Sequence, residues 1–190
     1  MRIVLADARP PLGDRIAGLL QASHTVVPVE DMSAPALDAA MTGADAVFHV
    51  PPLLGSGPAP DLAAERQELD DARRFYLLLQ AAVARNVRRV VHVSSLAVMR
   101  GHFGQGYILT ERWCPRPGAN AHDLALHAEE MALREFVHQH RFAGVCLRID
   151  EDWLRGQPPR TEAVAGACAR GLVMDAPWGR LFGVFHVRID

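Results

Sequence analysis

A chain of 190 residues is long enough to form one domain with a buried core, and its net charge of −2 gives no electrostatic reason to expect nucleic acid or an anionic membrane as a partner. Hydrophobic residues make up 49% of the chain, but no apolar run approaches the roughly 18 residues that a membrane-spanning helix needs. We therefore expect a soluble globular protein. All 20 basic residues are arginine, which excludes Schiff-base chemistry through lysine.

The cysteines and the N-terminus bear on redox state and location. Cys114, Cys146 and Cys168 are odd in number and lack the spacing of a metal site, so we expect reduced thiols and no metal centre. The start, MRIVLAD, leads directly into a strand pattern without a visible signal peptide, which predicts a cytoplasmic protein. The arginine- and alanine-rich, lysine-free composition is typical of a GC-rich bacterial genome and suits specialised metabolism.

Strand and helix patterns alternate along the first part of the chain. Short apolar runs alternate with segments whose apolar residues recur every three or four positions. His49 lies within the third apolar run, and we expect it to be a buried core histidine. The predicted elements are a strand at 2–6, a turn and helix within 8–20, a strand at 24–30, a helix at 34–41 and a strand at 44–50.

The same alternation continues to the end of the chain. A Pro/Gly-rich loop at 51–60 has the composition of a long connection or a lid, and a loop at 99–118 is predicted to line an active site rather than to pack. The predicted elements are a long helix at 61–86, a strand within 88–95, a second long helix at 120–140, a strand at 143–149, and a helix and strand within 161–187.

This order of elements predicts the α/β class, as a Rossmann-like doubly wound parallel sheet. We expect one domain over residues 1–190, with its core in 1–150 and only a residual helix and strand in 151–190. Val90, Val91 and Val93 form the β-branched run typical of a buried parallel strand. Ser95 ends this strand, where open α/β sheets place their ligands.

Several segments resemble the extended short-chain dehydrogenase/reductase family, of the NAD-dependent epimerase/dehydratase type. VVHVSSLAV resembles its central strand and serine turn, FYLLLQAAVARNVRR the preceding helix, and ADAVFHV its GxDxVxHxAA segment. The resemblance places Ser95 at the family's catalytic Ser/Thr. The 41 residues after Ile149 resemble the family's late helix and final strand, so its substrate-binding subdomain is predicted to be nearly absent.

The cofactor motif of the family is largely lost. Where the family has TGAxGxxG, this chain reads ADARPPLG, so only Gly13 matches, while Asp7 and Pro10 replace the first two glycines. An aspartate adds negative charge near the expected phosphate, and a proline removes an N–H donor. Glu30 or Asp31 can hold a ribose hydroxyl, or Asp31 can simply cap the next helix. One strand–helix unit of the family is missing here, and the cofactor is therefore predicted to be absent or NAD(P).

The family's YxxxK motif, with its proton-transferring tyrosine, is replaced in two possible registers. The segment NAHDLALHAEE places His122 at the tyrosine and Leu126 at the lysine, or, shifted by one residue, Asp123 and His127. We prefer the first register because Glu130 then matches the family's later acid. A histidine can move protons near neutral pH, and Asp123 or His127 can assist it. Alternatively, Asn120 only caps a helix whose polar residues face water.

Three functions follow from this conflict between fold and motifs. The first is proton-transfer chemistry on a small molecule, by isomerisation, dehydration or cyclisation, using Ser95 and His122. The second is an NAD(P)-dependent epimerase or reductase with atypical motifs, and the third is a non-catalytic metabolite-binding or regulatory subunit. The expected partner is a small-molecule ligand, and the resemblance implies a possible homodimer through the helices at 61–86 and 120–140.

Overall fold

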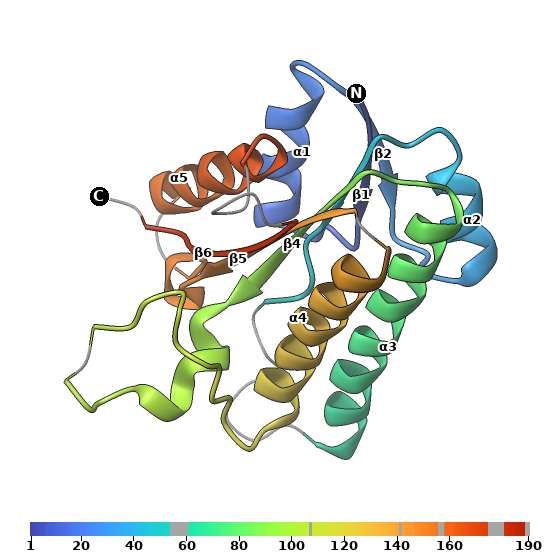
Figure 1. Cartoon of the computed structure of the whole chain (residues 1–190). Coiled ribbons are helices and arrows are strands. Elements are labelled where there is room, and N and C mark those ends of the chain that lie inside the picture. The colour runs from blue at the N-terminus through green and yellow to red at the C-terminus, as the bar shows by residue number, and fades with distance from the viewer. Residues whose placement is uncertain (54–60, 107, 141, 156–157, 175–180, 189–190) are drawn as a thin grey trace.

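The computed structural model describes residues 1–53, 61–106, 108–140, 142–155, 158–174 and 181–188, and it contains a six-stranded parallel sheet (Figure 1). The strand order is β2-β1-β3-β4-β5-β6, and every neighbouring pair is parallel. The strands are β1 (Arg2–Ala6), β2 (Thr25–Val29), β3 (Ala46–His49), β4 (Arg89–Ser95), β5 (Ala143–Ile149) and β6 (Phe182–His186).

Helices cover both faces of the sheet, as the figure shows. On one face lie α1 (Leu12–Gln21) and α5 (Pro158–Ala169), which contact each other. On the other face lie α2 (Ala34–Met41), α3 (Leu62–Ala84) and α4 (Ala121–His140), and α3 packs along α4. Three short 3-10 helices complete the described structure: η1 (Leu96–His102), η2 (Glu151–Trp153) and η3 (Arg170–Leu172).

The sheet is buried on both sides, because each strand alternates its side chains between two hydrophobic cores. In β4, Val91 and Val93 belong to the core beneath α1 and α5, whereas Val90 belongs to the core beneath α2, α3 and α4. His92 is on the same side of the strand as Val90 and is also fully buried. The predicted doubly wound parallel sheet is confirmed.

The order in which strands are added reverses between β1 and β3. The chain first places β2 on one side of β1 and then returns to place β3 on the other side. In open α/β sheets the crevice at such a switch point binds ligands. Among the described residues only β2 lies outside β1, in agreement with the predicted loss of one strand–helix unit. We therefore expect a ligand site at the carboxyl ends of β1, β3 and β4.

The segment after β4 differs from its prediction. We expected residues 99–118 to form an active-site loop without packing, but Met99 is fully buried within η1, together with Ala97 and Val98. Val98 and Met99 can leave water here because η1 turns them into the core below α1. Residues 54–60 of the predicted lid loop lie outside the described part of the chain. In that described part, no helix is both long and apolar enough to cross a membrane.

Candidate functional site

The N-terminus of α4 positions His122 beside Glu151. The Asn120 side chain accepts a hydrogen bond from the Asp123 amide at 2.8 Å and so caps the helix, as expected, but the alternative that the polar residues there face water is wrong, because Asp123 is fully buried. His122 Nε2 lies 2.9 Å from Glu151 Oε1 in η2. Burial lowers the pKa of His122, but the hydrogen bond and the charge of Glu151, together with Glu68 and Asp123, outweigh it and raise that pKa. The imidazole is therefore held in place and can carry a proton near neutral pH.

Asp123 follows His122 in the sequence but lies in a different environment. Its carboxylate is fully buried and accepts hydrogen bonds from Arg100 Nε at 2.6 Å and from the Gly118 amide at 3.0 Å. These bonds connect η1 and the loop after it to the start of α4. Because both carboxylate oxygens already have partners, Asp123 serves as a structural anchor next to His122.

Ser95 lies at the end of β4, as the sequence predicted, but its side chain also starts the next helix. Its Oγ accepts a hydrogen bond from the Ala97 amide at 2.9 Å, and the residue is buried. A hydroxyl that accepts in this way keeps its own hydrogen for donation. The neighbouring Ser94 donates to Glu130 at 2.6 Å.

His127 is half-buried one turn after Asp123. Its Nδ1 atom is buried and has no hydrogen-bond partner among the described residues. The structure does not join His127 to the His122–Glu151 pair by any described hydrogen bond. The predicted assisting role of His127 remains a prediction.

The turn after β1 does not suit a pyrophosphate. Asp7 has a left-handed backbone, with φ of 52°, and its side chain is buried, with Arg9 Nε 3.2 Å from Oδ1. Burial raises the pKa of Asp7, although Arg9 and Arg74 act in the opposite direction. A Cβ at Gly13 would lie 2.3 Å from the carbonyl carbon and oxygen of Ala8, so this glycine is needed for packing α1 against the turn. The residues present therefore do not fit the pyrophosphate of a dinucleotide bound in the usual way.

The acidic residues after β2 face solvent. Glu30 and Asp31 are both exposed at the carboxyl end of the strand, where the fold places a ribose. Asp31 Oδ1 accepts a hydrogen bond from the Ser33 amide at 2.9 Å, which lowers the pKa of Asp31. Asp31 thus forms the turn that leads into α2, and Glu30 is exposed beside it.

A narrow pocket opens between α3, α4 and the segment after β3. Its volume is about 10 Å³, close to the space that one water molecule needs. His122 and Glu129 both line it, so the pocket connects the His122–Glu151 pair with a second polar group in the interior. The remaining lining residues are Pro51, Pro52, Glu68, Asp71, Ala125 and Leu126.

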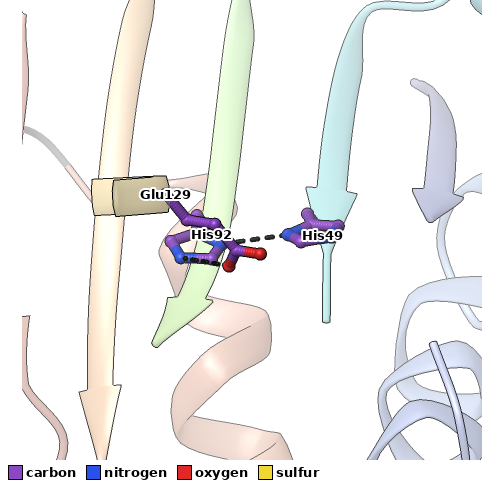
Figure 2. A group of neighbouring side chains, drawn as sticks. All are labelled: His49, His92 and Glu129. Atoms are coloured by element: carbon purple, nitrogen blue, oxygen red, sulfur yellow. Dashed lines mark hydrogen bonds and ion pairs between the residues drawn. The ribbon is translucent and has the colours of Figure 1, made fainter. Parts of the chain in front are cut away.

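That interior group consists of His49, His92 and Glu129, drawn in Figure 2. His49 Nδ1 lies 3.0 Å from His92 Nδ1, and His92 Nε2 lies 3.5 Å from Glu129 Oε2. The three residues are 2%, 0% and 2% exposed. Phe75 of α3 packs against both imidazole rings, with centroid distances of 4.5 and 4.6 Å.

Burial favours the uncharged form of each residue in this group. Desolvation and the neighbouring His92 hold the pKa of His49 well below its usual range, and desolvation lowers the pKa of His92 to about 4. Desolvation also raises the pKa of Glu129 well above its usual range, and Asp7 and Glu130 add to this effect. Two facing Nδ1 atoms can form a hydrogen bond only when one of them carries a hydrogen, so the two rings must take complementary tautomers.

Sequence reasoning found one member of this group and missed two. The expected burial of His49 is confirmed. The available signal for His92 was a histidine within the β-branched run RRVVHVSS, in register with His49 on the adjacent strand. The sequence held no signal for Glu129, because the family pattern matches only the neighbouring Glu130.

The fold matches that of several solved structures. UDP-N-acetylglucosamine 4-epimerase from Bacillus cereus has a TM-score of 0.76 at 14% identity, over 98% of this chain and 77% of that chain. MoeE5 in complex with UDP-glucuronic acid and NAD has a TM-score of 0.78 at 16% identity, over 98% and 76%. A short-chain dehydrogenase/reductase superfamily protein from Agrobacterium tumefaciens, with bound NAD, has a TM-score of 0.64 at 23% identity, over 78% and 49%.

At these identities the likeness shows the fold alone. It confirms the fold that the sequence resemblance to short-chain dehydrogenases implied. No protein-family model matches the sequence, and no curated protein matches it either. Activity must therefore be argued from the residues of this chain.

Proposed function

We propose that this protein is an enzyme that transfers protons on a small molecule, using a short-chain-dehydrogenase-like scaffold without standard hydride transfer. The observation that carries the proposal is the partly buried His122–Glu151 pair, 2.9 Å apart, whose His122 also lines the narrow pocket. Glu151 orients the imidazole and favours its protonated form, while His122 exchanges the proton with the ligand. Ser95, at the end of β4, supplies a hydroxyl for a developing negative charge.

The residues around this pair support proton transfer more than redox chemistry. Leu126, in the preferred register, stands where the related enzymes have a lysine, and it is buried among apolar side chains. No lysine exists elsewhere in the chain to replace it. The turn after β1 also holds a buried aspartate where a pyrophosphate would pass. The favoured reactions are therefore isomerisation, dehydration or cyclisation of a small molecule.

Solvent-exchange spectroscopy tests this proposal without a known substrate. The protein is incubated in D₂O with a panel of hydroxy-carbonyl compounds, including sugars and sugar nucleotides, and deuterium incorporation is followed by NMR. We expect enzyme-dependent exchange on at least one compound class, reduced at least 100-fold in His122→Asn. His138→Asn, on the exposed side of the same helix, is the matched control and should exchange at the wild-type rate.

An exchange rate that is equal in the wild type and His122→Asn would overturn the role of His122. Ligand binding and deuterium exchange are also measured for Ser95→Ala. If the wild type exchanges deuterium with none of the compounds, and both variants still bind a ligand, the protein is a metabolite-binding or regulatory subunit instead.

An NAD(P)-dependent epimerase or reductase is the second candidate. The observation that favours it is the accessible Glu30 at the end of β2, in a fold shared with proteins whose structures contain NAD. Calorimetric titration with NAD(H) and NADP(H) decides between the two. Micromolar binding that weakens in Glu30→Ala would support the redox candidate, whereas no binding at millimolar concentration would eliminate it.

The predicted homodimer remains part of the proposal. An apolar groove of about 600 Å³ runs between the outer faces of α3 and α4, lined by Tyr76, Met131 and Phe136 among others. A second copy of the chain would cover this groove. Light scattering after size exclusion should give a dimer for the wild type and a monomer for Met131→Glu, and a wild-type monomer at high micromolar concentration would overturn the dimer.

A further inference from the structure

We propose that His49, His92 and Glu129 form a binding site for one divalent transition-metal ion of the zinc type. The three residues come from β3, β4 and α4, and each offers a ligand atom within 4.8 Å of the others. The proposal is independent of the reaction assigned to His122, because it concerns only what these three side chains bind. Figure 2 shows them facing one another.

The donor set suits such an ion. Two imidazole nitrogens and one carboxylate oxygen are the ligands found in zinc sites that keep a further coordination position open. Imidazole ligands also favour zinc, cobalt and copper over magnesium and calcium, which prefer oxygen ligands. The three side chains lie within the interior rather than at the surface, so they form a built group and not a chance cluster of exposed acids.

The distances are close to those that coordination needs. The two Nδ1 atoms are 3.0 Å apart. With Zn–N bonds of about 2.05 Å, an ion between atoms at this distance makes an N–Zn–N angle of about 95°, within reach of tetrahedral geometry after small shifts. Glu129 completes the set when its carboxylate turns from His92 Nε2 toward the two Nδ1 atoms. Phe75 stacks on the His49 ring and packs at a tilt against the His92 ring, which limits the rotation of both.

Unmet polar capacity in the group points independently to a ligand. Glu129 Oε2 and His92 Nε2 are buried and have no hydrogen-bond partner among the described residues, and they are 3.5 Å from each other. The neighbouring Glu130 is paired with Arg148, and Arg74 forms an ion pair with Asp71 of its own helix. A divalent cation would contact the carboxylate directly, whereas Arg74, paired with Asp71, lowers the pKa of Glu129 through its charge.

A small pocket adjoins the group. Glu129 lines the narrow pocket, and Glu68 and Asp71 line it as well. Acidic groups on a pocket wall raise the local concentration of cations. The volume of about 10 Å³ admits a water-sized particle, which suits an ion better than an organic ligand. His122 lies on the same pocket, so an open coordination position would face it.

Titration of the chelator-stripped full chain with Zn²⁺ or Co²⁺ alone tests the site. Calorimetry should find one equivalent bound at micromolar or tighter dissociation constant, and Co²⁺ should acquire the visible absorption of a low-symmetry nitrogen- and oxygen-ligated site. We expect at least tenfold weaker binding in each of His49→Gln, His92→Gln and Glu129→Gln. The melting temperature of the wild type should rise by about 5 °C or more with saturating Zn²⁺, and that of Glu129→Gln should not.

His138→Gln is the matched control, since it removes an exposed histidine from the same helix and should bind as the wild type does. Glu129→Gln keeps the shape of the side chain, so it still tests the site if a histidine variant fails to fold. No binding at millimolar Zn²⁺, or binding that Glu129→Gln and His49→Gln leave unchanged, would overturn the metal site. The three residues would then form only a hydrogen-bonded core group.

Discussion

Two adjacent glutamates on α4 occupy opposite electrostatic surroundings. Glu130 accepts hydrogen bonds from Arg148 Nη2 at 2.6 Å and from Ser94 at 2.6 Å, and this pairing lowers its pKa despite burial. Glu129 faces two histidines, and burial raises its pKa. The pKa of the same residue type at neighbouring positions is therefore lowered in one case and raised in the other. The difference teaches that burial alone does not fix the charge of a carboxyl group, because the available partner decides it.

Removing the charge of Glu130 should give the largest effect. Glu130→Gln leaves Arg148 buried without its carboxylate, and loss of one partner of a buried ion pair costs about 3–5 kcal/mol. Urea unfolding at pH 7 measures this loss. Glu135→Gln, on the exposed side of α4, should change the free energy of unfolding by less than about 0.5 kcal/mol. A loss below 1 kcal/mol for Glu130→Gln would mean that the pair contributes little.

The acid sensitivity of the histidine group should come next. The pKa of His92 is about 4 in the folded state and about 6.5 when unfolded, so the unfolded chain binds the extra proton. Its contribution to stability is complete above pH 6.5 and is lost as the pH falls from about 6.5 to 4, by roughly 3 kcal/mol. His92→Gln, unfolded by urea across this range in the presence of a chelator, should show a shallower slope than His138→Gln. Equal slopes would place His92 outside the acid response.

Glu129→Gln should cost little, which sharpens the contrast with Glu130. Because burial raises the pKa of Glu129 and so favours its uncharged form, replacing it by an amide of the same shape should alter the free energy of unfolding by no more than about 1 kcal/mol. The measurement is urea unfolding of the metal-free protein at pH 7. A loss as large as that of Glu130→Gln would show that Glu129 is ionised in the folded state.

The smallest effect is expected at the partly exposed start of the same helix. Glu151→Gln removes the partner that raises the pKa of His122, so that pKa should fall, which an NMR titration of the His122 ring can follow. A group with a raised pKa stabilises the fold below its unfolded pKa of about 6.5 and loses that contribution as the pH rises through the folded value. The loss in Glu151→Gln at pH 6 should not exceed about 1 kcal/mol. An unchanged His122 pKa would remove Glu151 from the proposed pair.

Much of the fold could be predicted because local patterns carry it. The strand–helix alternation predicted the parallel sheet, and the helix at Ala34–Met41 begins and ends where its apolar spacing indicated. The strand around Val91 is buried on both faces, as its β-branched run predicted. Each of these features depends on residues within one short window, and such signals survive in a single sequence.

The candidate site could be predicted only in part. The sequence by itself determined that lysine chemistry is excluded, that Ser95 ends a central strand, and that His122 starts a long helix. The roles of these residues depended on partners far along the chain. Ser95 accepts from a helix amide, and His122 meets Glu151, 29 residues later.

Only the tertiary structure decided which polar residues meet in the interior. Successive residues on a helix point about 100° apart, so Glu129 turns toward the histidines of β3 and β4 while Glu130 turns toward Arg148 on β5. His49 and His92 are separated by 43 residues and become neighbours only through strand pairing. Local sequence sets the elements, whereas packing of the elements sets the charge of each buried group.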